Sequence, residues 1–185
     1  MQRITEILAP YLRLVTDGGM SPLLQARQAE MPLSALLAGY EAASYARRLC
    51  PNGDAWELAK TLGVNVEQRQ APEKISPGRY ARSDYVPWPA TVTLYLGPME
   101  ELADLIFWRR PSLGDMDLPS VHLAHELFHH LLAHPPEDLA GRLRRVPGQA
   151  EETAAHAFTH GFLDLSFFPA ELDLLDRRPR HDAPL

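Results

Sequence analysis

The sequence contains a single cysteine, Cys50, and therefore cannot form an internal disulfide bond. This scarcity is typical of proteins from a reducing compartment. The sequence also has no stretch that approaches the roughly 18 apolar residues that a membrane span requires. Its first residues, MQRITEILAPYL, lack the continuous apolar run of a signal peptide. We therefore expect a soluble, cytoplasmic protein that does not enter a membrane.

Basic residues are also scarce. There are 18 lysine and arginine residues against 24 aspartate and glutamate residues, which gives a formal net charge of -6. Because phosphate binding needs a basic surface, this charge argues against nucleic acid as the main partner. Hydrophobic residues make up 45% of the 185 residues, which is enough for the core of a globular protein. No feature of the sequence indicates an oligomeric state.

Helical periodicity dominates the first part of the chain. It is present in residues 4–15, with a bend expected at Pro10, in a stretch from 21 to 30, and again from 33 to 49. We find no helix-turn-helix and no basic recognition segment among these helices. Residues 1–50 are therefore predicted to be a helical N-terminal segment rather than a DNA-binding domain.

A short helix and a strand follow this segment. Asp54 is a typical N-cap residue, and Glu57 three residues later completes a capping box. Gly63 is expected to end the helix in the C′ position. Val64 and Val66 alternate with polar neighbours, which predicts a strand. The pattern thus changes from purely helical to mixed structure.

The clearest strand is Thr91–Leu96, which alternates and is rich in β-branched and aromatic residues. Residues 68–90, which precede it, are rich in proline and arginine and predict a long loop or a pair of loops. Residues 98–110 fit a helix or a strand equally well. We expect residues 51–170 to form an α+β domain with a small twisted sheet packed beside two helices. A short helix and a tail are expected in 171–185.

The residues that carry chemistry lie in two helices predicted for 120–134 and 149–163. The first helix contains the motif HExxH, formed by His125, Glu126 and His129. A spacing of four residues advances a helix by about 400°, so the two imidazoles project in nearly the same direction, one turn apart. Two imidazoles placed in this way can bind one Zn²⁺ at the usual distance of about 2.0–2.1 Å.

Glu126 lies about 100° around the helix from His125. This direction makes it a poor third ligand but suits a general base that acts on an activated water molecule. The alternative is that the motif arose by chance, which the composition predicts for roughly two such chains per hundred. The apolar surroundings argue against chance, because an unpaired histidine or glutamate there would cost desolvation energy.

A third metal ligand must come from another element, because His134 comes too late in the same helix and Pro135 occupies the position where a metzincin has histidine. Glu151 and Glu152 begin the next helix. Glu152 shares a helical face with His156, whereas Glu151 points about 100° away. We therefore predict Glu152 as the third ligand, with Glu151 as the alternative.

His156 lies one turn beyond Glu152, where it could donate a hydrogen bond to a carboxylate or orient a metal-bound histidine. We predict a catalytic role for it alongside Glu126. His160, a further turn along, could stabilise an oxyanion or contact substrate. For both histidines the alternative is a surface position near a crowded site. His122, one turn before the motif, is expected to be only a neighbour.

With these residues in place, the chain resembles the ImmA/IrrE family of cytoplasmic metallopeptidases. Members carry HExxH in a helix, here AHELFHHLLAH, and a downstream helix of the form E-x-x-A-N-x-F-A that leads to an apolar stretch ending in proline. Here that helix runs from Glu152 through Phe158, and GFLDLSFFP follows. The element AWELAKTLGVNV, Ala55 to Val66, is similar to one that often precedes the family's catalytic core. His156 replaces the usual asparagine and Thr159 the usual alanine, which leaves the subfamily and substrate open.

The resemblance implies metal ligands at His125, His129 and Glu152, a gluzincin-like set, and a general base at Glu126. It also implies a zincin-like fold in which a sheet edge receives an extended peptide, and we expect Thr91–Leu96 to be that edge. The implied function is a zinc-dependent endopeptidase for a protein substrate, such as a transcriptional repressor, in stress response or regulatory proteolysis. The alternative is a metal-binding regulatory protein with this fold and little proteolytic turnover. Another divalent ion could occupy the same ligands.

Overall fold

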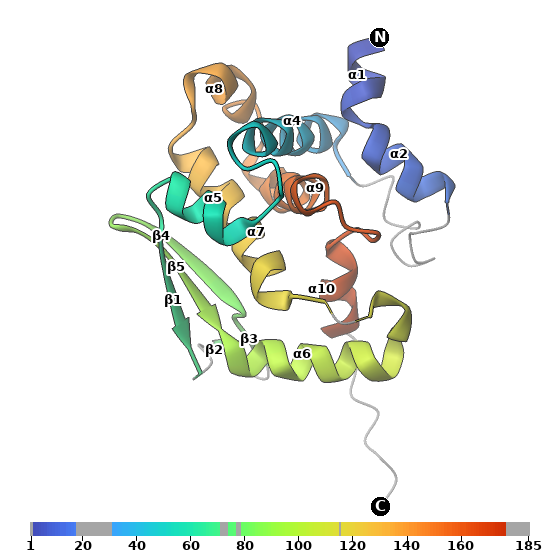
Figure 1. The fold of residues 1–185 in the computed structure, drawn as a ribbon, viewed down its shortest axis with the longest axis vertical. Coiled ribbons are helices and arrows are strands. Elements are labelled where there is room, and N and C mark those ends of the chain that lie inside the picture. Colours follow the sequence, from blue (N-terminus) through green and yellow to red (C-terminus); the bar gives the residue numbers. More distant parts are fainter. Residues whose placement is uncertain (1, 18–30, 71–73, 77–78, 115, 177–185) are drawn as a thin grey trace, which may run out of the picture.

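A computed structural model of the chain describes residues 2–17, 31–70, 74–76, 79–114 and 116–176. They form an α+β fold in which the strands lie on one side of the molecule and helices make up the rest (Figure 1). This confirms the predicted fold class at that level. In the part of the chain that is described, no helix is long and apolar enough to cross a membrane.

The described part of the N-terminal segment is helical, as predicted. α1 (Gln2–Ile7) and α2 (Ala9–Thr16) form two short helices, and Pro10 lies in the first turn of α2, where its missing N–H has no intrahelical partner to lose. α4 spans Leu33–Leu49, the predicted bounds. The helix expected in residues 21–30 lies outside the described residues.

α4 packs along α9 (Glu151–Leu163) and shares its hydrophobic core. Ala42 and Ala46 of α4 are fully buried in the same cluster as Phe158 of α9. The two backbones are so close that a Cβ atom on Gly39 would collide with the carbonyl group of Ala154. The N-terminal segment therefore helps to fix the position of the helix that carries Glu152.

The main sheet has three strands in the order β1, β5, β4. β1 (Asn65–Arg69) is parallel and β4 (Ser83–Pro87) antiparallel to the central strand, β5 (Ala90–Tyr95). β5 confirms the predicted strand at Thr91–Leu96 to within one residue. However, the prediction that this strand is the substrate-binding edge is wrong. A strand paired on both sides has no free row of backbone N–H and C=O groups to offer a peptide.

β4 is an edge strand among the described residues, and it lies against α7 (Leu118–Ala133). Residues 68–90 were predicted to be loop, yet they contain β4 and the antiparallel pair of β2 (Lys74–Ser76) and β3 (Arg79–Tyr80). The prediction failed because β4 is short and polar. Its inward-facing side chains are not aliphatic, and they make polar contacts with α7 instead.

Two helices flank the sheet in sequence. α5 (Ala55–Thr61) begins as predicted at Asp54, whose side chain accepts hydrogen bonds from the backbone N–H groups of Trp56 and Glu57 at 2.8 and 3.1 Å. After β5, the ambiguous segment forms a helix, α6 (Leu96–Arg109). The sheet is therefore connected to the rest of the chain by helices at both ends.

The second half of the chain is helical. α7 starts two residues before the predicted position, because Asp117 caps it by accepting a hydrogen bond from the N–H group of Ser120 at 3.2 Å. The connection after α7 was predicted to be a mostly polar link, yet it contains α8 (Glu137–Leu143), which buries Leu139 and Leu143. The remaining elements are η2 (Pro111–Leu113), η3 (Gly148–Ala150) and α10 (Ala170–Asp176).

Candidate metal centre

α7 and α9 pack against each other and bring together the three predicted metal ligands. The Nε2 atoms of His125 and His129 on α7 lie 3.3 Å apart. Glu152, in the first turn of α9, places one carboxylate oxygen 3.3 Å from Nε2 of His125 and the other 3.5 Å from Nε2 of His129. Glu152, rather than Glu151, is thus the acid that lies in this cluster, and its role as a metal ligand stays a prediction.

The spacing of these atoms fits a zinc ion. Four-coordinate zinc with bonds of about 2.0–2.1 Å holds its ligand atoms roughly 3.3 Å apart. One ligand atom from each of the three residues can be chosen so that all lie within 4.8 Å of one another. Two imidazoles and one carboxylate are also a donor set that zinc accepts, and three protein ligands are the number typical of catalytic rather than structural zinc sites.

The cluster is open to solvent on the side of α9. The side chain of Glu152 is 68% exposed, whereas those of His125 and His129 are 15% and 19% exposed. The histidines are thus fixed by the packing of α7, and the carboxylate reaches them from the surface. The cluster can therefore be reached from solvent on that side.

The charged forms of the residues in the cluster stabilise one another. Burial disfavours the charged form of His125, but the carboxylates of Glu152 and Glu126 outweigh this effect and raise the pKa of His125. Hydrogen bonds from His125 and His129 hold the pKa of Glu152 far below its usual range. Glu152 is therefore an anion at neutral pH, and a cation that binds here competes with protons for the imidazoles.

Glu126 does not join the three ligands and has its own partner. The residue is buried, with 9% exposure, and its Oε1 atom accepts a hydrogen bond of 2.7 Å from the hydroxyl group of Ser83 in β4. Ser83 was missed because its segment was predicted to be loop. Glu126 is thus a carboxylate adjacent to the cluster and separate from it, as the predicted general base must be.

His156 is held next to the cluster by a carboxylate. Its Nε2 atom lies 3.3 Å from Asp173 of α10, and its ring centroid is 5.0 Å from that of His125. Asp173 also lies 3.5 Å from Arg82, which directly precedes β4. His156 is buried, with 9% exposure, so it is not a surface residue, and this burial lowers its pKa. The geometry is that of a hydrogen bond to a carboxylate beside a ligand, and the catalytic role of His156 stays a prediction.

α10 reaches His156 because it is anchored at the end of α6. Glu171 is buried, with 1% exposure, and forms an ion pair of 2.7 Å with Arg110. Asp173, two residues later, faces α9. The sequence predicts a short helix here, but helical periodicity alone does not show which of its acidic residues turns toward His156.

The two remaining histidines of the prediction lie outside the cluster. His160 is buried, and its Nδ1 atom is 2.9 Å from the hydroxyl group of Tyr40 in α4. Burial lowers the pKa of His160 to about 4, and that of His122 to about 3. His160 therefore contributes to the contact between α9 and α4, and the alternative of a surface position is wrong. His122 is a neutral neighbour of the site.

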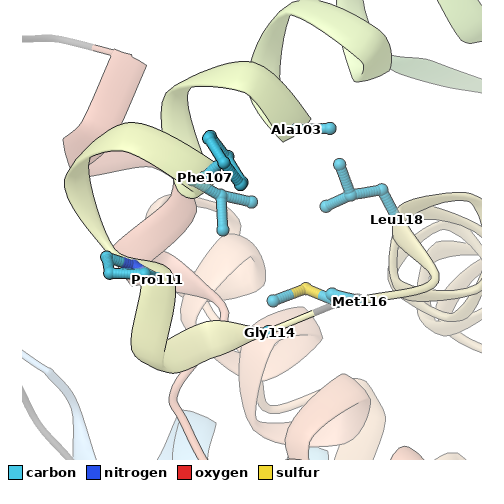
Figure 2. Close-up of a pocket in the computed structure, with 7 residues that line it drawn as sticks. Ala103, Phe107, Pro111, Gly114, Met116 and Leu118 are labelled. Atoms are coloured by element: carbon cyan, nitrogen blue, oxygen red, sulfur yellow. The ribbon is translucent and has the colours of Figure 1, made fainter.

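Two cavities lie elsewhere among the described residues. Figure 2 shows one of about 410 Å³ between α6, η2 and the start of α7, lined only by apolar residues and glycine, with the rings of Phe107 and Pro111 at its wall. The other, of about 700 Å³, contains Asp54 and Asp117, which cap α5 and α7. Neither of these two cavities is lined by a predicted ligand or by Glu126.

The resemblance to the ImmA/IrrE family is carried by the HExxH helix and by the helix that begins at Glu151, both of which the structure contains. Family membership stays a prediction, and the case for a function depends on the geometry of the metal centre. Searches of the chain against protein-family models, curated proteins and solved structures found no match.

Proposed function

We propose that the protein is a zinc-dependent endopeptidase with a zincin-like fold, in which His125, His129 and Glu152 bind the metal and Glu126 is the general base. The observation that carries this proposal is the convergence of two Nε2 atoms and one carboxylate at 3.3–3.5 Å from one another. A second, buried carboxylate lies beside them without joining them. Metal-assisted hydrolysis needs this division between three ligands and one separate acid.

When bound, the zinc ion supplies a Lewis acid that polarises the scissile carbonyl group and lowers the pKa of water. Glu126 accepts a proton from water as the water oxygen forms a bond to the carbonyl carbon. The same carboxyl group then gives that proton to the amide nitrogen as the C–N bond breaks. The products are a carboxylic acid and an amine, the acid then gives its proton to the amine to leave a carboxylate and an ammonium group, and Glu126 returns to its charged form.

The position of β4 supports a peptide substrate. β4 lies against α7, its Ser83 contacts Glu126, and its outer edge has no partner strand among the described residues. An extended peptide can pair with such an edge through backbone hydrogen bonds. This edge replaces the one expected at β5. That the substrate is a transcriptional repressor follows from the family resemblance alone and is part of this proposal.

The experiment that tests the proposal uses the variant Glu126→Gln. The amide is nearly isosteric and Glu126 is not a ligand, so the variant should retain zinc and the fold. It should capture uncut substrate from cells, and the wild-type protein should then cleave the captured protein. Cleavage by the variant should be slower by about 10²–10⁴-fold, as expected for the loss of a general base.

Two outcomes count against the proposal. An unchanged cleavage rate in Glu126→Gln would contradict the assigned mechanism. A full cellular effect of Glu126→Gln, together with loss of that effect in His125→Ala, would instead support the metal-binding regulatory protein. His125→Ala is the matched control because it removes a ligand and leaves Glu126 in place.

A further inference from the structure

β4 contacts α7 at three successive turns of the helix. The three residues are Glu126 and His130 of α7 and His134, the C-cap residue of that helix, each four positions after the last. Their partners in β4 and the turn that follows it are, in the same order, Ser83, Tyr85 and Trp88. Glu126, the general base of the proposed reaction, is therefore the first of three residues in a row along the helix that contact β4 and the turn after it.

The contact between Ser83 and Glu126 occupies one oxygen of the carboxylate. The hydroxyl group donates to Oε1 at 2.7 Å, and the carboxylate is almost fully buried. The Oε2 atom is then the oxygen left to act on water. The last torsion of a glutamate side chain has a broad minimum, so without this donor the plane of the carboxylate can rotate away from this orientation.

The second contact fixes the strand itself. The hydroxyl group of Tyr85 lies 2.9 Å from Nδ1 of His130. The two groups are within hydrogen-bond distance, and the tautomer of the imidazole decides which of them donates. Because Tyr85 is two residues after Ser83, this bond holds Ser83 on the face of the strand that meets Glu126.

We propose that Ser83 is a positioning residue for Glu126, and that the hydrogen bond between Tyr85 and His130 fixes the strand that carries it. The proposal rests on the proposed function, since only there is Glu126 a base. Ser83 holds Oε1, so Oε2 takes the proton from water and returns it to the leaving nitrogen without rotation of the carboxyl group. The strand whose edge receives the substrate thereby also orients the base.

The first test needs no substrate. Crystal structures of the zinc-loaded variants Ser83→Ala and Ser83→Thr are compared with the wild type. Threonine keeps the hydroxyl group and suits a strand, so Glu126 should keep a single orientation in Ser83→Thr. In Ser83→Ala the carboxyl group should occupy more than one orientation, with the same backbone and the same zinc content. A single, unchanged orientation in Ser83→Ala would overturn the proposal.

The second test separates positioning from folding. Initial rates are measured on peptides from a digest of denatured cell proteins, with new termini counted by mass spectrometry, and kcat and KM are then determined on a cleaved peptide. Ser83→Ala should lower kcat by about 10-fold at unchanged KM, as expected for the loss of a hydrogen bond to a charged group. Ser83→Thr should recover most of the rate. The exposed Ser112, changed to alanine, is the matched control and should leave both constants unchanged.

A double variant distinguishes this inference from the proposed function. In the Glu126→Gln background, Ser83→Ala should lower the rate no further, because the group that it positions is already inactive. An equal loss in both backgrounds would show that Ser83 acts on the fold, and would overturn the inference alone. A wild-type rate in Glu126→Gln would instead refute the proposed function, whatever the effect of Ser83→Ala.

Discussion

α7 and its C-cap residue carry two histidine pairs with the same spacing, and among the described residues only one of them forms a candidate metal site. The ring centroids of His125 and His129 are 5.2 Å apart, and those of His130 and His134 are 4.9 Å apart. Ring spacing on the helix therefore does not distinguish the pairs. The facing element does, since the first pair meets a carboxylate from α9 and the second meets a hydroxyl group and an indole ring from β4 and its turn.

The two histidine pairs differ in the charge of their surroundings as well as in the element that faces them. Neighbouring carboxylates raise the pKa of His125 against the effect of burial, whereas burial and a second imidazole lower the pKa of His130. The surroundings of the first pair are negative and suit a cation. Those of the second are neutral, and Tyr85 satisfies one ring nitrogen of His130. A pair of histidines at helical spacing thus becomes a candidate metal site only where another element brings a carboxylate to it.

The largest effect on zinc binding is expected from removing Glu152, the carboxylate that α9 brings to the first pair. Glu152→Ala should weaken zinc affinity by more than the roughly 10–100-fold typical of losing a partner outside the ligand set, because a ligand is lost outright. Glu151→Ala, one position away, should change it only slightly. Competition with a chromophoric chelator measures both affinities. If the effect of Glu151→Ala equals or exceeds that of Glu152→Ala, the electrostatic comparison between the two pairs fails.

A histidine that faces a hydroxyl group should resist protonation, and His160 is the more buried example. Burial lowers its pKa to about 4 against the opposing effect of Asp164, from an ordinary value of 6.5. Because the unfolded chain binds the proton first, this contribution to stability is complete above a pH of about 6.5 and is lost as the pH falls toward 4. Between pH 7 and pH 5 the loss is about 2 kcal/mol.

His160→Gln keeps a polar partner for Tyr40 but removes the titration. The free energy of unfolding in urea, measured at pH 7 and pH 5, should therefore fall less in this variant than in the wild type, by about 2 kcal/mol. The exposed His134, changed to glutamine, serves as the control. Equal pH dependence in the wild type and His160→Gln would show that His160 is not held neutral.

The smallest effect concerns the second pair. Tyr85→Phe removes the hydroxyl group that faces His130 and should lower the free energy of unfolding by about 1 kcal/mol, the usual net value of such a hydrogen bond. Zinc content should stay unchanged. Tyr45→Phe, in α4, is the control and should have less effect. Loss of zinc in Tyr85→Phe would mean that the two pairs are not independent.

The features predicted correctly from the sequence are those that depend on local helical geometry. The spacing within α7 places His125 and His129 on one face, and the same geometry selects Glu152 rather than Glu151. Both arguments need only the turn angle of a helix. The bounds of α4 and the cap at Asp54 follow from equally local signals.

The features that were missed depend on contacts between distant segments. Ser83 and Tyr85 belong to a short polar strand that is recognisable only when its pairing with β5 and its contact with α7 are known. Strand order is also non-local, which is why the clearest strand was mistaken for an edge. Asp173 reaches His156 because an ion pair to α6 fixes α10. No periodicity in the sequence encodes these placements.

The central claim is that His125, His129 and Glu152, and not the second histidine pair, form the metal centre. Its most direct test is the zinc content of the purified wild type, His125→Ala and His130→Ala, after dialysis and with folding checked by circular dichroism. The wild type and His130→Ala should each carry close to one equivalent of zinc, and His125→Ala should carry almost none. Zinc that persists in His125→Ala, or that is lost equally from both variants, would contradict the assignment.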